Sequence, residues 1–238
     1  MQIFVILPAA GLGTRMSQAR APKQFLAIAG VPVLIRSLNA FLAMPEITSL
    51  TVAVRAPEMQ RVREQIAEHL PNPSKPVTVV EGGDSRQESV SKALASLTAA
   101  QADDIVLVHD AVRPLIDADT ISRTIEAVQK HGAAIVGTPA LDTVKVVERT
   151  SDGAIVTSTI PRERVVLAQT PQGFRAGLLR KAFAEAEADG FVGTDEASLA
   201  ERAGIPVAVV AGPPRNFKIT QPGDLELAEF YFSAPESR

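Results

Sequence analysis

Short, almost wholly apolar segments recur along the chain, and stretches of helical periodicity separate them. The first such segment, residues 3–7, ends at a Pro-Ala-Ala-Gly turn. Runs of this kind are typical of strands in a parallel sheet, because helices cover both faces of such a sheet. Six runs predict strands at 3–7, 50–54, 77–80, 105–108, 133–136 and 207–210.

Apolar residues spaced three and four positions apart predict amphipathic helices between these strands. The sets are Met59, Val62, Ile66 and Leu70; Val90, Leu94 and Leu97; and Ile121, Ile125 and Val128. Ser85 and Glu88 predict a capping box at the start of the second set. Further helices are expected at about 175–189, 195–203 and 223–232. The alternation of strands and helices predicts an α/β fold with right-handed crossovers.

Residues 142–160 interrupt this alternation. Apolar and polar positions alternate on either side of a Thr-Ser-Asp-Gly turn at 150–153, which predicts a β-hairpin. The pattern leaves two interpretations open, an extension at the edge of the sheet or an arm that packs on another subunit. Because no internal repeat or linker is present, we expect one domain spanning 1–238, with the arm at about 142–160.

Composition narrows the class of protein. The 238 residues are 46% hydrophobic and 21% charged, as in ordinary globular proteins. The net charge of −3 gives no basic field to attract nucleic acid. The absence of cysteine excludes disulfides, thiolate nucleophiles and Cys-ligated zinc. The apolar run at 3–7 is too short to cross a membrane and has no basic segment before it, so we expect a soluble, cytoplasmic protein without a membrane partner.

A loop of small residues follows the first predicted strand. Ala10, Gly11 and Gly13 let backbone N–H groups approach a phosphate or a base closely, and Arg15 adds a cation. Met16 replaces the third glycine of a dinucleotide-binding fingerprint, and the Gly-Lys-Ser/Thr ending of a P-loop is missing. The loop therefore favours neither NAD binding nor P-loop ATP hydrolysis. Lys23, by itself, is typical of a solvated surface lysine, but beside this loop it becomes a candidate phosphate ligand.

Two further segments follow predicted strands. Gly82 and Gly83 precede a helix start, whose free N–H groups could bind a ligand, although a capped helix explains the segment equally well. Asp110 and Arg113 could point into one crevice, where Asp110 would orient a hydroxyl or a metal and Arg113 would hold an anion. A purely structural ion pair is the alternative. His109 should face the opposite way and pack.

Each of the remaining candidate residues is only a weak indication of function when taken by itself. Arg162 follows the hairpin, and Lys218 lies on a short strand-like segment near the chain end. Thr194 is a natural helix N-cap with acidic residues after it. His69 and His131 fall near predicted helix C-termini, so the three histidines do not assemble a zinc site.

The order of the motifs is far more specific than any one of them. From residue 9 to residue 220 the chain carries Ala-Ala-Gly-x-Gly-x-Arg, Pro-Lys-Gln, Gly-Gly-x-x-Arg-x-x-Ser-Val, His-Asp-Ala-x-Arg-Pro, Gln-Thr-Pro-Gln, Thr-Asp-Glu-Ala and Asn-x-Lys-Ile-Thr. This order resembles the 2-C-methyl-D-erythritol 4-phosphate cytidylyltransferases of the non-mevalonate isoprenoid pathway. The resemblance implies a Rossmann-like nucleotidyltransferase fold with a seven-stranded, mainly parallel mixed sheet, and a homodimer joined through the β-arm. It also implies transfer of CMP from CTP to methylerythritol phosphate with release of pyrophosphate.

The resemblance further implies a role for each matching residue. The loop that enfolds CTP corresponds to Ala10, Gly11 and Gly13, and the triphosphate contacts to Arg15 and Lys23. The segment that recognises cytosine corresponds to Gly82, Asp84 and Ser89, and the ribose and substrate segment to Asp110, Ala111 and Arg113. Residues that hold methylerythritol phosphate across the dimer correspond to Arg162 and Thr170, and the remaining substrate-facing positions to Thr194 and Lys218.

The chemistry of this reaction agrees with the residues present. A phosphate oxygen attacks the α-phosphorus of CTP in line, so the barrier is dominated by bringing two anions together. Arg15 and Lys23 are expected to stabilise the charge on the α-phosphate and on the leaving pyrophosphate. Arg162 and Lys218 are expected to position the attacking phosphate. Mg²⁺ is expected to be held mainly by the CTP phosphates. No general base and no protein-borne metal site is expected.

Two alternatives stay open at this point. One is a cytidylyltransferase for another polyol phosphate, notably ribitol 5-phosphate, and the other is a non-catalytic nucleotide-binding protein. Because no second catalytic domain follows Arg238, we expect no fused cyclodiphosphate synthase.

Overall fold

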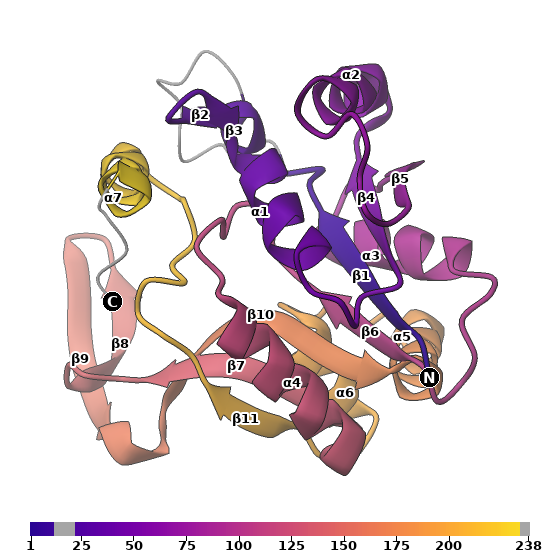
Figure 1. Ribbon diagram of the computed structural model, residues 1–238. Coiled ribbons are helices and arrows are strands. Elements are labelled where there is room, and N and C mark those ends of the chain that lie inside the picture. The colour runs from indigo at the N-terminus through magenta and orange to yellow at the C-terminus, as the bar shows by residue number, and fades with distance from the viewer. Residues whose placement is uncertain (12–21, 234–238) are drawn as a thin grey trace.

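The computed structural model describes residues 1–11 and 22–233 and shows a seven-stranded sheet between two layers of helices (Figure 1). The strand order is β11-β7-β10-β6-β1-β4-β5. The strands are β1 (Ile3–Pro8), β4 (Ser49–Val54), β5 (Val77–Glu81), β6 (Ile105–Val108), β7 (Ala133–Pro139), β10 (Val166–Arg175) and β11 (Ala208–Ala211). All pairs are parallel except those of β10, which runs antiparallel to both β6 and β7. The expected mixed, mainly parallel α/β sheet is confirmed.

Alternate side chains of β1 enter two separate hydrophobic clusters. Val5 and Leu7 pack under α1 (Val33–Leu42), α2 (Met59–His69) and α4 (Ala118–His131). Phe4 and Ile6 pack on the other face under α3 (Arg86–Ser96), α5 (Ala176–Ala188) and α6 (Glu196–Arg202). Burial on both faces is the reason that β1 is apolar along its whole length.

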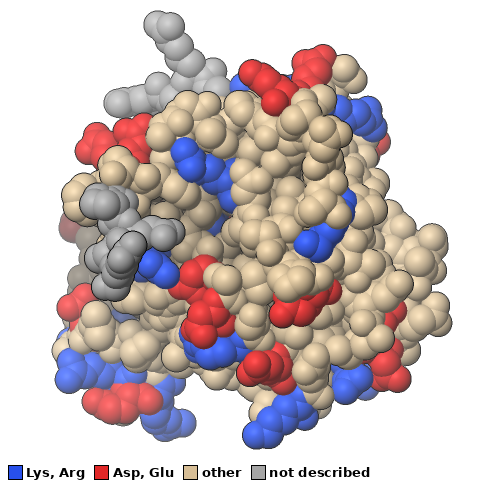
Figure 2. Space-filling model, viewed as in Figure 1, with Lys and Arg blue, Asp and Glu red and all other residues tan. Residues whose placement is uncertain are grey.

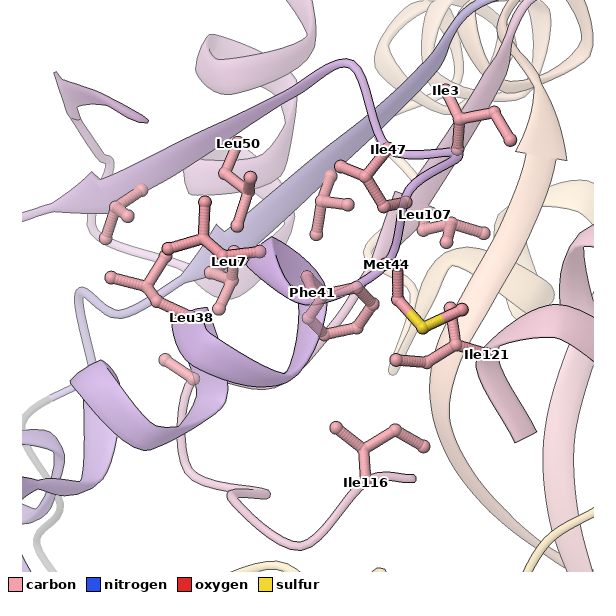
Figure 3. Close-up of a cluster of buried hydrophobic side chains, with 14 of the residues drawn as sticks. Ile3, Leu7, Leu38, Phe41, Met44, Ile47, Leu50, Leu107, Ile116 and Ile121 are labelled. Atoms are coloured by element: carbon pink, nitrogen blue, oxygen red, sulfur yellow. The ribbon is translucent and has the colours of Figure 1, made fainter. Parts of the chain in front are cut away.

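Helix α1 was not among the predicted elements, yet it anchors one cluster. Figure 3 shows its Leu38 and Phe41 among side chains of the sheet, including Leu7 and Leu50. A third cluster forms around Ile28 where α7 (Pro222–Ser233) packs beside the short strands β2 (Ala27–Ile28) and β3 (Val31–Pro32).

Strand β10 was also missed. It lies in the middle of the sheet, but its buried positions include Gln169, Thr170 and Gln172, so it carries no apolar run. Its register on β7 shifts between Ala168 and Gln172.

The predicted hairpin is present as β8 (Val144–Thr150) and β9 (Gly153–Ile160). It forms a sheet of its own that projects from the main one (Figure 1), and Val147, Ile155 and Val156 are exposed on it. Two predicted caps need correction. Asp195, not Thr194, caps α6, because its carboxylate accepts from the Ser198 N–H. Ser85 caps α3 as expected, but the Glu88 carboxylate reaches back to the N–H of Asp84 instead of that of Ser85.

None of the described helices is long and apolar enough to cross a membrane. Figure 2 shows lysines and arginines interspersed with acidic side chains over one face of the molecule.

Candidate functional site

A cavity of about 260 Å³ opens at the carboxyl ends of β1, β5 and β6. Ligands of open α/β sheets bind at this edge, because the loops leaving parallel strands converge there. The walls are Pro8, Ala9, Ala10, Gly11, Lys23, Gln24, Gly83, Asp84, Ser85, Arg86, Ser89, Asp110, Ala111, Val112, Lys218 and Thr220. Eight candidates from the sequence are therefore brought together: Ala10, Gly11, Lys23, Asp84, Ser89, Asp110, Ala111 and Lys218. Gly13 and Arg15 lie outside the described residues.

The loop after β1 is tied to the segment that carries Lys23. Gln24 is buried, and its side-chain amide donates to the carbonyl oxygen of Ala9 at 2.9 Å and to that of Gly11 at 3.4 Å. Because Gln24 directly follows Lys23, these bonds place the lysine on the cavity wall. Gln24 belongs to the Pro-Lys-Gln motif, but the sequence alone assigns it no role.

A side chain at either glycine of the loop after β5 would displace a neighbouring side chain. A Cβ on Gly82 would come within 2.9 Å of Ser89 Oγ, and one on Gly83 would overlap the Glu88 side chain. Ser89 Oγ accepts from the Gly83 N–H at 3.0 Å and donates to the Ser85 carbonyl at 2.8 Å. Gly82 itself lies beside the cavity, in a neighbouring groove.

Asp110 is the electrostatic centre of the site. Its carboxylate is buried and contacts three cations: Lys218 Nζ at 3.0 Å and Arg113 Nε at 3.2 Å on Oδ2, and Arg86 Nε at 3.3 Å on Oδ1. Burial alone would raise the pKa of Asp110, but the charges of Lys218, Arg86 and Arg113 hold the pKa far below its ordinary value. The carboxylate is thus ionised at neutral pH, and three cations surround it.

Arg113 does not line the cavity but connects two of its walls. Its Nη1 donates to the carbonyl oxygen of Asn216 at 2.8 Å. The Asn216 side chain is buried and donates to Gln169 Oε1 and to the Thr170 carbonyl. Arg113 therefore links the loop after β6 to the segment that carries Lys218.

His109 and Thr170 form a chain of hydrogen bonds that ends at the backbone N–H of Asp110. The Asp110 N–H donates to the Thr170 hydroxyl at 3.0 Å, and that hydroxyl lies 3.0 Å from His109 Nδ1. His109 Nε2 lies 3.1 Å from the Arg113 carbonyl, which can only accept, so Nε2 carries the proton and Nδ1 accepts from Thr170. Burial lowers the pKa of His109 to about 4, and its ring packs edge-on against Phe41. The predicted packing role of His109 is confirmed.

Besides Gly82 and Arg113, three further candidates do not line the cavity. Thr170 is buried, with its hydroxyl engaged as described. Thr194 is exposed just before α6. Arg162 is exposed at the base of the hairpin, where it donates to the Leu141 carbonyl at 2.9 Å and lies 3.6 Å from Glu163.

Arg86 and Glu196 were not assigned roles from the sequence. Arg86 lines the cavity and donates from Nη1 to Glu196 Oε1 at 2.6 Å. Arg86 belongs to the motif Gly-Gly-x-x-Arg and Glu196 to the motif Thr-Asp-Glu-Ala, so the motifs could have indicated that both residues are functional. Only the fold shows that the two side chains are in contact.

Among the described residues, no group of three or more histidine and acidic side chains is arranged to hold a metal ion. Asp84 and Asp110 are the carboxylates on the cavity wall, and Asp110 is occupied by cations. This donor set fits a magnesium ion carried by substrate phosphates, since Mg²⁺ in such sites takes one or two protein carboxylates at most.

Comparison with known proteins agrees with this geometry. The family model "IspD: 2-C-methyl-D-erythritol 4-phosphate cytidylyltransferase" matches residues 3–234. The chain is 64% identical to the 2-C-methyl-D-erythritol 4-phosphate cytidylyltransferase of Acidobacterium capsulatum over the full length of both, and 47% identical to that of Solibacter usitatus, covering 100% of this chain and 98% of that one. The crystal structure of the Francisella tularensis enzyme superposes with a TM-score of 0.80 at 34% identity, covering 97% of this chain and 99% of the other. The resemblance inferred from the motifs is confirmed, and the chain belongs to the 2-C-methyl-D-erythritol 4-phosphate cytidylyltransferase family.

Proposed function

We propose that the cavity at the carboxyl ends of β1, β5 and β6 is where this chain transfers CMP from CTP to 2-C-methyl-D-erythritol 4-phosphate. The observation that carries the proposal is the cluster of Arg86, Arg113 and Lys218 around the buried Asp110. The reaction brings a phosphate monoester and a triphosphate together. A cavity wall with excess positive charge, fixed in advance, lowers the cost of that encounter.

CTP is assigned to the side of the cavity formed by the loops after β1 and β5. Ala10, Gly11 and Lys23 would contact the triphosphate. Backbone groups near Gly82 and Gly83, with Asp84 and Ser89, would read the cytosine edge, since a loop without side chains can approach a base closely. Gly13 and Arg15 keep the roles in CTP binding that the resemblance implies.

The acceptor phosphate is assigned to Lys218. Asp110 holds its Nζ at the cavity wall, and the side chain is 34% exposed, so the ammonium can donate to a bound phosphate. An oxygen of that phosphate forms a bond to the α-phosphorus of CTP, the bond from the α-phosphorus to the bridging oxygen breaks, and pyrophosphate leaves with the electron pair. The attacking phosphate is already an anion, so no residue has to remove a proton. Mg²⁺ held by the CTP phosphates would neutralise part of their charge.

A homodimer through the arm is also proposed. The hairpin β8–β9 exposes apolar side chains on a small sheet of its own, and Arg162 at its base lies apart from the cavity of its own subunit. In a two-fold dimer the arm would bring Arg162 to the partner's cavity. Thr194, just before α6, is assigned with Lys218 to the remaining substrate-facing positions. Thr170 would act by holding the Asp110 backbone.

The direct test is pyrophosphate release from CTP with Mg²⁺ and methylerythritol phosphate. Ribitol 5-phosphate in parallel reactions measures acceptor choice. Release with methylerythritol phosphate far above that with ribitol phosphate is the expected result. Preference for ribitol phosphate, or no release with either acceptor, would reject the proposal.

A further inference from the structure

Arg86, the first residue of α3, bridges two carboxylates from distant parts of the chain. Its Nε lies 3.3 Å from Asp110 Oδ1, and its Nη1 lies 2.6 Å from Glu196 Oε1. The side chain is 27% exposed and lines the cavity. Among the described residues, its Nη2 group makes no hydrogen bond, so one edge of the guanidinium keeps its donors available.

Glu196 is buried to an unusual degree for a carboxylate. Its side chain is 1% exposed, and its Oε2 has no hydrogen-bond partner among residues 1–11 and 22–233. Burial raises the pKa of Glu196, and Arg86 acts in the opposite direction. A hydrophobic pair of the same volume would commonly be as stable as a buried ion pair. The Glu196–Arg86 contact is therefore better explained by the orientation that it gives to Arg86.

The position of Glu196 is itself fixed by β10 and the helix cap. Gln172 on β10 donates to the carboxylate of Asp195 at 2.8 Å and accepts from the Ala197 N–H at 3.0 Å. These bonds hold both residues that flank Glu196. The carboxylate thus offers Arg86 a rigid anchor on one side, and Asp110 offers one on the other.

Arg86 and Lys218 hold opposite oxygens of one carboxylate. Both line the cavity, whose wall carries three cations, Lys23, Arg86 and Lys218, against two carboxylates, Asp84 and Asp110. A planar guanidinium with free donors matches the geometry of a phosphate group better than a lysine does.

We propose that Arg86 binds the phosphate of the acceptor beside Lys218, and that Glu196 is a positioning residue that orients Arg86 for this contact. The inference rests on the proposed function, because that function places the acceptor phosphate at Lys218.

The first test replaces Arg86. R86Q should raise KM for methylerythritol phosphate roughly 10- to 100-fold, as expected for loss of a charge-assisted hydrogen bond, and should change KM for CTP much less. R86K keeps the charge without the planar fork and should recover part of the loss. R180Q is the matched control, because Arg180 is also a partly buried arginine, donates to the carbonyls of Leu97 and Ala100, and is not among the cavity residues. An unchanged acceptor KM in R86Q, or a larger rise for CTP than for the acceptor, would overturn the assignment.

The second test asks whether Glu196 affects acceptor binding through Arg86. E196A should also raise KM for the acceptor, but it should add nothing further in an R86Q background, because it acts through Arg86. E196Q, whose amide oxygen still accepts from Arg86, should keep most of the acceptor affinity. Should E196A fail to fold, E196L carries the same cycle, because it fills a similar volume but offers Arg86 no acceptor. Additive effects of the two substitutions would show that Glu196 does not act through Arg86.

Binding measurements keep this inference distinct from the proposed function. Titration calorimetry of methylerythritol phosphate into the protein should show weaker binding to R86Q than to the unmodified chain and to R180Q. A protein that binds the acceptor through Arg86 but releases no pyrophosphate would contradict the proposed function alone. Equal binding by R86Q and R180Q would contradict the inference, whatever the activity.

Discussion

Replacing Asp110 by Asn removes the charge that three cations share but keeps the shape of the side chain. Removing one partner of a buried ion pair costs about 3–5 kcal/mol. The Arg113 side chain is 11% exposed, whereas those of Arg86 and Lys218 are 27% and 34% exposed and are partly screened by water. We therefore expect D110N to lose about 2–4 kcal/mol of unfolding free energy at pH 7. In a chain of this size that loss lowers Tm by roughly 5–15 °C.

The pH dependence of this loss follows from the pKa of Asp110. Burial alone would raise that pKa, but the charges of Lys218, Arg86 and Arg113 lower it well below its ordinary value of about 3.9. A depressed pKa in the folded state means that the ionised carboxylate contributes stability above the unfolded pKa, and that this contribution is lost as pH falls through the folded pKa. The difference between the unmodified protein and D110N should therefore be constant from about pH 8 to pH 5 and shrink below about pH 4.

Urea unfolding at a series of pH values measures the difference, with D103N as the control. Asp103 also pairs with an arginine, Arg175, at 3.1 Å, but its side chain is 90% exposed, so its loss should change stability by less than about 0.5 kcal/mol. Equal unfolding free energies for D110N and the unmodified protein at pH 7, or a difference that widens on acidification, would refute the reasoning.

Three other outcomes follow from the proposed roles. K23A should lower kcat roughly 100-fold with unchanged folding, because a charge-stabilising donor is lost. A near-normal rate would show that Lys23 does not contribute to the reaction. K218A should raise KM for methylerythritol phosphate more than KM for CTP, and steady-state kinetics in which only CTP suffers would contradict its assignment. An equimolar mixture of K23A and R162A subunits, reassembled at random, should recover about a quarter of full activity, because about half of the dimers are mixed and one of the two sites in each mixed dimer has both residues intact. If mixed dimers form, as judged by mass, and regain nothing, then Arg162 does not serve the partner's site.

The strand β10 could not be predicted from the hydrophobic pattern, because several of its buried residues are polar. Gln172 and Thr170 occupy buried positions in the middle of the sheet, and an apolar pattern cannot predict a strand there. They are tolerated because their polar atoms are bonded to distant residues, Gln172 to Asp195 and Thr170 to Asp110. The cap of α6 was misplaced by one residue for a related reason, since Thr194 and Asp195 are both good N-caps and only the backbone decides between them.

The sequence by itself determined the parallel strands, most of the helices, the hairpin and the family, whereas only the structure shows that the hairpin forms a sheet of its own. The central parallel strands were evident because burial on both faces favours apolar residues at nearly every position, and the loops that line the cavity follow β1, β5 and β6 directly. Only the tertiary structure decided which charges meet. Arg86 and Glu196 are 110 positions apart, and Lys218 is nearly as far along the chain from Asp110, so no local pattern relates them. They come together because β6 ends between α3 and the segment after β11, where a buried carboxylate is stable only with cations around it.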